Sequence, residues 1–246
     1  VRQGAAAIRT ALATEAAAAR RLVVVDAVAD ADLLAIGEAV ATDRLVTGGS
    51  GIALGLPENF RKAGLLRGGG AGFATANGPG VVLSGSCSIA SRGQVAAHLA
   101  GHPGLAVAPD ALMRGDITVD SAVAFVRDNL DKAPIVYSTA EPEAVRAAQD
   151  RFGRETVAAA IEGFFGDVAA RLVDAGVTRI AVGGGETSGA VVTALGVASL
   201  RIGPEIDPGV PALVADGRKP VHLALKSGNF GAPDFYAKAL GVMGGA

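Results

Sequence analysis

The sequence has 246 residues, and its 22 Lys and Arg residues nearly balance 24 Asp and Glu residues, giving a formal net charge of −2. This balance gives no electrostatic reason to expect nucleic acid or an anionic membrane as a partner, and no apolar run reaches the ~18 residues of a membrane-spanning helix. The one cysteine, Cys87, excludes an internal disulfide framework and a cysteine-based zinc site, and we expect a reducing, cytoplasmic location.

The first 60 residues predict helices that alternate with strands. An alanine-rich run from Arg9 to Arg21 favours a helix, and the β-branched run "RLVVVDAV" (21–28) predicts a buried strand. Asp30 is a candidate cap for a second helix, and "RLVTGGSG" (44–51) predicts a second short strand. Since this set is too small to bury its own core, we expect residues 1–60 to be the C-terminal part of a larger α/β domain.

The first residues of the sequence bear on whether the chain is a fragment. Val1 is followed almost at once by a helical stretch, with neither Met nor a signal peptide before it. We therefore expect the chain to be a fragment of a longer protein and to be inactive alone.

Residues 61–79 predict a linker. The stretch "LLRGGGAGFATANGPG" (65–80) has six glycines and little periodicity. The alternative is an ordered loop inside a single domain.

Residues 80–246 predict a second domain in which strands and helices alternate. Half of the residues in the whole sequence are hydrophobic, only 4% are aromatic and 35 are glycine, which suits helices packed closely on a sheet. We expect an α/β fold with a mostly parallel sheet and flanking helices. The expected strands are 80–86, 105–109, 134–139, 178–184, 199–203, 211–216 and 221–228. The expected helices are 91–100, 120–132 and 157–172, with two more from Glu186 and from Pro233.

Four of the expected strands end in loops rich in glycine and small hydroxyls or in charges among glycines. The loops are "SGSCS" (84–88), "GGGETS" (183–188), "GPEIDPG" (203–209) and "KSGNFG" (226–231). Ligands of open α/β sheets collect at the carboxyl ends of strands, and backbone N–H groups beside a helix start suit phosphate oxygens. Each loop taken alone is also compatible with an ordinary turn or helix cap, but four together favour a phosphate site.

Other candidate motifs are weak or absent. No P-loop and no G-x-G-x-x-G after a strand occurs in the sequence. Cys87 near a helix start could be an activated thiol, but no histidine lies near it in the sequence, and a small buried thiol is the better interpretation. We interpret His98 and His102 as structural residues.

The loops taken together resemble those of the four-carbon acid sugar kinase family, which includes the 3-oxo-tetronate kinases. The resemblance rests on "TGGSGIALGLPENF", "VVLSGSCS", "VGGGETSGAVVTALGV", "IGPEIDPGVP" and "LALKSGNFG". It implies a sugar-acid-binding domain ending near residue 60 and a nucleotide-binding domain over 80–246. The family's opening Asp-Asp-Phe-Thr-Gly motif is not in this sequence. The resemblance implies ATP contacts from Ser84, Ser86 or Ser88, from Gly184, Gly185, Glu186 and Thr187, and from Gly228.

Further roles are hypotheses from the chemistry of the residues. Lys226 could neutralise a phosphate, and Glu186, Glu205 or Asp207 could hold Mg²⁺, with Glu186 and Asp207 preferred. The apolar residues expected to flank adenine are Pro204, Ile206 and Val210.

Two functions remain open from the sequence. The first is an ATP-dependent kinase that phosphorylates a four-carbon sugar acid such as 3-oxo-tetronate, with the catalytic base outside this chain. Its partners would be ATP with Mg²⁺ and the sugar acid, and an oligomer is compatible with the sequence. The alternative is a non-catalytic α/β module that binds a phosphorylated metabolite.

Overall fold

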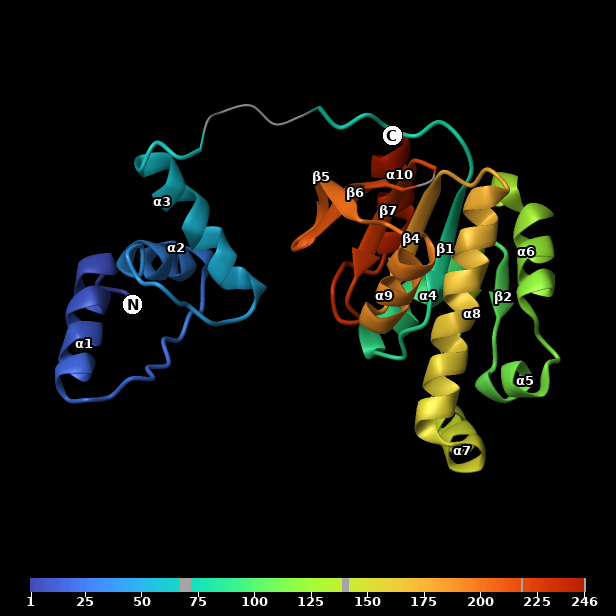
Figure 1. The fold of residues 1–246 in the computed structure, drawn as a ribbon, viewed down its shortest axis with the longest axis horizontal. Helices are drawn as coiled ribbons and strands as arrows, with labels where there is room; N and C mark the ends of the chain where they lie inside the picture. The colour runs from blue at the N-terminus through green and yellow to red at the C-terminus, as the bar shows by residue number, and fades with distance from the viewer. Residues whose placement is uncertain (67–71, 139–141, 218, 246) are drawn as a thin grey trace. The chain divides into compact units, whose positions relative to one another are not determined.

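The computed structural model describes residues 1–66, 72–138, 142–217 and 219–245. The chain divides into two compact units, Val1–Ala71 and Gly72–Ala246, which we call the N-terminal and C-terminal units (Figure 1). None of the helices in these described ranges is both long and apolar enough to cross a membrane.

The regular elements of the N-terminal unit in its described residues are all helices, joined by irregular segments. It contains α1 (Ala5–Ala17), α2 (Asp30–Ala39), the 3-10 helix η1 (Ser50–Gly55) and α3 (Leu56–Lys62). Its small core is formed by Ile8 of α1 with Ile36 and Ala39 of α2. Gly37 and Gly55 allow α2 and η1 to meet closely, because a Cβ atom on Gly37 would lie 2.4 Å from the Gly55 carbonyl oxygen.

The two strands predicted in this unit are wrong. Residues 21–28 form neither helix nor strand, and Leu22 and Val24 are 93% and 91% exposed. Residues 44–49 are also irregular, and Ser50 and Gly51 belong to η1 instead. A strand is stable only when its N–H and C=O groups pair with a neighbour, and the described part of this unit contains no other strand.

The predicted linker, 61–79, divides between the two units. Its first two residues complete α3, and residues 67–71 lie outside the described part. Near its end the chain lies along the C-terminal unit. Ala76 N–H donates to the Met243 carbonyl (2.8 Å), and the ring of Phe73 packs edge-on against His222.

The C-terminal unit is built on a mixed sheet that is mostly parallel, so the predicted α/β fold class is confirmed. Within the described residues, its seven strands lie in the order β2-β3-β1-β4-β7-β6-β5. The strands are β1 (Gly80–Ser84), β2 (Gly104–Ala106), β3 (Ile135–Tyr137), β4 (Arg179–Gly183), β5 (Ser199–Asp207), β6 (Val210–Asp216) and β7 (Val221–Lys226). The first five in spatial order are parallel.

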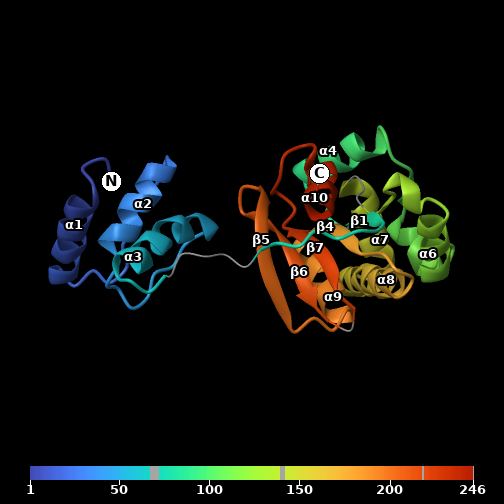
Figure 2. The same ribbon diagram turned by 90° about the horizontal axis from the view of Figure 1, so that it is seen from above.

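Helices cover both faces of this sheet (Figures 1 and 2). Because successive side chains of a strand point to opposite faces, Val81 and Leu83 enter one core and Val82 enters the other. The first core is completed by α6 (Val119–Arg127), α8 (Arg154–Asp174) and α9 (Gly185–Ala194). The second is completed by α4 (Ile89–Leu99) and α10 (Phe235–Gly244). The remaining elements are α5 (Pro109–Arg114), η2 (Leu130–Lys132) and α7 (Pro142–Phe152).

Two local predictions in this unit need correction. The helix expected over 120–132 begins at Val119 and ends at Arg127, and Thr118 caps it by accepting a hydrogen bond from Ser121 N–H (3.2 Å). The expected loop 203–209 is mostly strand, because β5 continues to Asp207 with register shifts against β6 after Ile202. Since β6 is antiparallel to both β5 and β7, β5 runs in the same direction as β7 and Asp207 still reaches the carboxyl edge.

Candidate functional site

Three of the predicted loops lie side by side at the carboxyl edge of the sheet. Gly85 N–H donates to the Gly183 carbonyl (2.9 Å), and Gly184 N–H donates to the Lys226 carbonyl (2.9 Å). These bonds connect the ends of β1, β4 and β7, which are adjacent in the sheet. Neighbouring parallel strands therefore bring together loops that are separated by about 100 and 40 residues in the sequence.

The three serines of the first loop have different surroundings. Ser84 is fully buried, and its Oγ accepts a hydrogen bond from the Tyr236 hydroxyl (2.9 Å). Burial raises the pKa of Tyr236 to about 12, so this hydroxyl keeps its proton at neutral pH. Ser88 caps α4 by accepting from Ser91 N–H (3.1 Å), and it donates to the Gly228 carbonyl (2.6 Å). Ser86 is the one of the three that lines the cleft described below.

The second loop presents the bare start of α9. Gly184 is the N-cap residue and provides no side-chain cap, and its φ of 121° lies in the region that favours glycine. The N–H groups of Gly185, Glu186 and Thr187 belong to the first turn, which has no partners inside the helix. Nothing lies within 4 Å of the place where a Cβ atom of Gly185 would stand. This helix start is therefore open to a ligand.

Lys226 is buried inside the third loop. It is 1% exposed, and its Nζ donates to Ser91 Oγ (3.0 Å), to the Gly228 carbonyl (3.1 Å) and to the Ser227 carbonyl (3.3 Å). Burial lowers the pKa of Lys226 to about 8 because desolvation disfavours the charged amine. The side chain holds this loop to α4, and in this arrangement its three donors are used within the protein.

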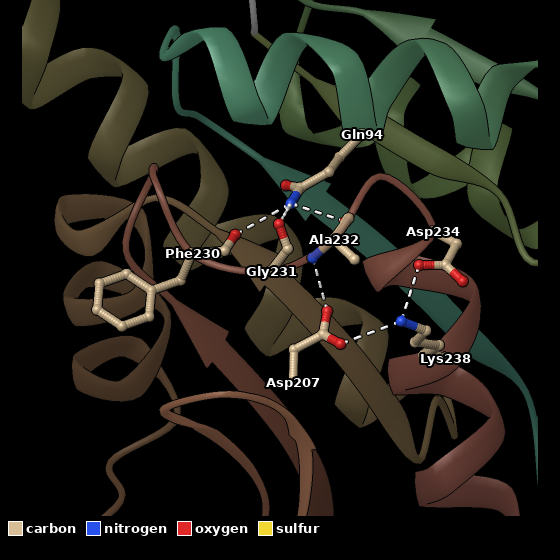
Figure 3. A network of polar contacts seen from close by, with 7 residues as sticks. All are labelled: Gln94, Asp207, Phe230, Gly231, Ala232, Asp234 and Lys238. Carbon is tan, nitrogen blue, oxygen red and sulfur yellow. Dashed lines mark hydrogen bonds and ion pairs between the residues drawn. The ribbon is translucent and has the colours of Figure 1, made fainter. Parts of the chain in front are cut away.

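Asp207 holds the far end of the same loop (Figure 3). The carboxylate is 7% exposed, and it accepts from Ala232 N–H (2.8 Å) and from Lys238 Nζ (3.1 Å) through different oxygens. Lys238 also pairs with Asp234 (2.9 Å), and these carboxylates raise the pKa of Lys238. Gln94 donates to the neighbouring carbonyls of the loop (Figure 3). Both oxygens of Asp207 are thus engaged by the protein.

No preformed metal centre occurs in the described ranges, where no three His, Cys, Asp or Glu side chains are grouped to hold a metal ion. Glu205 accepts from Gly209 N–H (2.8 Å) at the β5–β6 turn. Of the three carboxylates predicted for Mg²⁺, the structure brings Glu186 to the cleft and not Glu205 or Asp207.

The first two loops open into a cleft of about 470 Å³ between the sheet edge and α7–α8. Its residues come from the first two loops, the end of β3 and helices α5, α7, α8 and α9. They are Gly85, Ser86, Cys87, Pro109, Ser138, Val145, Gln149, Val157, Ala158, Ile161, Glu162, Gly184, Gly185, Glu186 and Thr187. Two of these lining residues, Glu162 and Glu186, carry carboxylates, and none of them is a lysine or an arginine.

The residues expected to flank adenine do not line this cleft. Val210 is 1% exposed and lies in the core under α10, and Ile206 packs against the same core. Pro204 lies on β5 and is exposed, but it does not line the cleft either.

Sequence reasoning missed the wall of the cleft on α7 and α8. The helical periodicity of 157–172 was visible, but it marks the face that packs on the sheet, including Phe165 and Leu172. Ile161 packs against the same core and also lines the cleft, and its neighbour Glu162 lines the cleft as well. The signal that could have found them is weak, because one helix turn separates core positions from cleft positions.

The other candidate residues from the sequence are Cys87, His98 and His102. Cys87 lines the cleft in a half-buried position, with its Sγ 3.9 Å from the Ser138 carbonyl. His98 and His102 hydrogen-bond to the carbonyls of Ala133 (2.9 Å) and Lys132 (2.8 Å), and burial lowers the pKa of His98. Both histidines lie outside the cleft, in agreement with structural roles.

Comparison with known proteins agrees with the geometry. Residues 81–236 match the family described as "Nucleotide-binding C-terminal domain", and residues 1–56 match "Sugar-binding N-terminal domain". The chain is 53% identical over 204 residues to a 3-oxo-tetronate kinase of Cupriavidus necator, covering 82% of this chain and 47% of that protein. It is 52% identical, with the same coverage, to a 3-oxo-tetronate kinase of Pseudomonas savastanoi pv. phaseolicola.

A solved Haemophilus influenzae protein shares the fold, with a TM-score of 0.72 and 39% identity over 98% of this chain and 58% of that one. The chain spans about half the length of the curated relatives it matches. The match over the C-terminal unit includes β1, the open start of α9 and the end of β7. The chain belongs to the four-carbon acid sugar kinase family.

Proposed function

We propose that this chain supplies the nucleotide-binding part of an ATP-dependent kinase that phosphorylates a four-carbon sugar acid of the 3-oxo-tetronate class. The observation that carries the proposal is the uncapped start of α9, which opens into a cleft large enough for a nucleotide. The names of the relatives supply the reaction and the substrate class. The N-terminal unit would then be the C-terminal part of the sugar-acid-binding domain, consistent with the match over residues 1–56.

The phosphates would be held mainly by backbone groups. The N–H groups of Gly185, Glu186 and Thr187 point along the start of α9, where the helix dipole also favours an anion. Ser86 adds a hydroxyl from the first loop. Gly228 lies next to it, because a Cβ atom on Gly228 would stand 2.5 Å from Ser86 Oγ.

Lys226, Ser84 and Ser88 would support this cradle from behind. Lys226 and Ser88 both donate to the Gly228 carbonyl, and Ser84 is bonded to Tyr236 beneath the loops. The positive charge of Lys226 would attract the phosphates only across the short loop that its side chain holds in place.

The charges of the cleft support the presence of a divalent cation when ATP is bound. Its lining carries Glu162 and Glu186 and no lysine or arginine, so the phosphates of ATP would face carboxylates. A metal between them removes this repulsion, and Mg²⁺ with oxygen ligands is the cation suited to it. We propose that Glu186 holds Mg²⁺, directly or through water, and that Asp207 instead fixes the 226–231 loop.

The chain's own part in phosphoryl transfer would be to position ATP and neutralise charge, since this reaction needs little covalent chemistry from the protein. The base for the acceptor hydroxyl would come from the sugar-acid-binding part of the longer protein. A cytoplasmic location would give such a kinase access to ATP.

Titration calorimetry of the full chain with Mg-ADP tests the proposal. Gly185→Val should abolish the binding heat, because the side chain would fill the open space at the start of α9. Gly189→Val is the matched control, since Gly189 lies on the same helix, also has open space around it and does not line the cleft.

A second readout uses Cys87, the one cysteine of the sequence. Because it lines the cleft, its alkylation by iodoacetamide should slow when Mg-ADP binds. Folded wild-type protein that gives neither heat nor protection would overturn the proposal. Binding of a sugar phosphate by that same protein would favour a non-catalytic module instead.

A further inference from the structure

The end of the cleft beside β3, α7 and α8 differs chemically from the phosphate end. We propose that it is the base-binding subsite, in which the hydroxyl of Ser138 and the amide of Gln149 recognise the edge of an adenine ring. This inference rests on the proposed nucleotide binding and adds to it where the base lies and what selects it.

Ser138 carries a hydroxyl that lacks a partner. The residue is 4% exposed, and its Oγ is buried without a hydrogen-bond partner in the part of the chain that the structure describes. Its backbone is fixed, because Ser138 N–H donates to the Ser84 carbonyl (2.8 Å) and extends the pairing of β3 with β1. Buried hydroxyls are nearly always hydrogen-bonded, since leaving one unpaired destabilises the folded state. Because Ser138 lines the cleft, the missing partner of its hydroxyl would be an atom of a ligand bound there.

The wall around this hydroxyl suits a flat, uncharged group. Val145 of α7 and Val157, Ala158 and Ile161 of α8 line the cleft together. Apolar side chains stabilise the faces of a purine ring, while a few polar groups fix its orientation. An apolar wall of this kind is suited to a base more than to a phosphate.

Gln149 supplies the second polar group. It lies on α7 four residues after Val145, so both residues share one face of the helix, and both line the cleft. A glutamine amide carries a donor and an acceptor, the combination that pairs with N6 and N7 of adenine. Guanine has an oxygen in place of the N6 amine, so the same amide pairs with it less well.

The sugar acid is a poorer occupant of this end. Its carboxylate would need N–H donors or a cation, whereas the polar side chains that we assign to this end are the uncharged Ser138 and Gln149, and no lysine or arginine is among the lining residues. The uncapped N–H groups that could receive an anion lie at the other end, on α9. The charges therefore favour an uncharged base beside Ser138.

Calorimetry of the full chain with Mg-ADP, Mg-GDP and Mg-tripolyphosphate tests the assignment. We expect Ser138→Ala to weaken ADP binding about tenfold, to weaken GDP binding less and to leave tripolyphosphate binding unchanged. Gln149→Leu should reduce the preference for ADP over GDP while the affinity for tripolyphosphate stays the same.

Ser188→Ala is the matched control. Ser188 Oγ is also buried and unpartnered among the described residues, but Ser188 does not line the cleft, so this variant should bind ADP like the wild type. Wild-type affinity for ADP in both Ser138→Ala and Gln149→Leu would overturn the subsite. Equal losses for ADP and tripolyphosphate would also overturn it, because they would place the effect at the phosphates. Failure of the wild type to bind any of the three ligands would instead reject the proposed function itself, and the subsite with it.

Discussion

The two units of this chain show how similar sequence patterns lead to different structures. "RLVVVDAV" in the N-terminal unit and "GVVLSGS" in the C-terminal unit are both short β-branched runs followed by polar or small residues. The second forms β1, which lies between β3 and β4 inside a sheet, with Val81, Val82 and Leu83 fully buried. The first is irregular, and Leu22 is 93% exposed. The difference is the presence of partner strands, not the composition of the run.

The two units also differ in which side chains they expose and which they bury. Of the fourteen exposed large hydrophobic residues in the described part of the chain, twelve lie in the N-terminal unit. All ten buried polar or charged residues of the described ranges lie in the C-terminal unit. Buried polar groups need a fixed framework that satisfies them. Only the C-terminal unit has that framework, and it carries the candidate site.

The two tyrosines make this comparison measurable. Tyr137 and Tyr236 both lie in the C-terminal unit, and the sequence has no tryptophan. Tyrosine fluorescence therefore reports unfolding of that unit alone, whereas far-UV circular dichroism reports helices in both.

The largest effect should come from Phe165→Ala. Phe165 is fully buried on α8 in the main core, so its removal leaves a cavity and should lower the free energy of unfolding of the C-terminal unit by about 3–5 kcal/mol. Urea denaturation followed by tyrosine fluorescence measures this change. An effect below about 1 kcal/mol would show that the core of the C-terminal unit is not as described.

The next effect concerns pH and the buried amine of Lys226. Its pKa of about 8 in the folded protein lies below the 10.5 of the unfolded chain, so the unfolded state binds more protons between these values and stability rises with pH. From pH 8 to pH 9.5 we expect a gain of about 2 kcal/mol in the free energy of unfolding of the C-terminal unit.

Urea denaturation at several pH values, followed by tyrosine fluorescence, measures this gain. The range stops below pH 10, because Tyr236, with its pKa raised to about 12, would reverse the trend at higher pH. Lys226→Met is the control and should show a flat profile over the same range. A wild-type profile as flat as that of the variant would contradict the burial of a charged amine.

A smaller effect should appear in the N-terminal unit with Gly37→Ala. The added methyl group would meet the Gly55 carbonyl oxygen at 2.4 Å and force α2 away from η1, at a cost of about 1–2 kcal/mol. Far-UV circular dichroism should show the loss at low urea, while the tyrosine transition stays in place. Gly49→Ala, where nothing lies within 4 Å, is the control. A shift of the tyrosine transition would mean that the two units unfold together.

The smallest effect should come from Leu22→Ser. Because Leu22 is 93% exposed, its replacement should change stability by no more than about 0.5 kcal/mol, as measured by circular dichroism in urea. Val25→Ala is the contrasting variant, since Val25 packs against the small core of this unit. A loss above 1 kcal/mol for Leu22→Ser would show that the run is buried in solution.

Much of the C-terminal unit could be predicted from the sequence. The seven strands were expected close to where they occur, and three of the four glycine-rich loops lie together as expected. Local pattern was sufficient because each buried run has a partner inside the same unit. It failed for 21–28 and 44–51, where short apolar runs predicted strands that have no partner in the described unit.

The candidate site could be predicted only in part. The sequence pointed to "GGGETS" and "SGSCS" because glycines and serines at strand ends are visible without a structure. It did not separate Ser86, which lines the cleft, from Ser84, which faces Tyr236 beneath it. It also placed Lys226 and Asp207 toward the ligand, whereas their contacts hold the 226–231 loop.

The sequence by itself determined the α/β class, the glycine-rich strand ends and the family, because these depend on local residue order. The tertiary structure decided which side chains face the cleft, and it added Ser138, Gln149 and the α7–α8 wall. The physical reason is that strand order and helix packing set the direction of each side chain. Residues such as Ser84 and Ser138 become neighbours only when β1 and β3 pair.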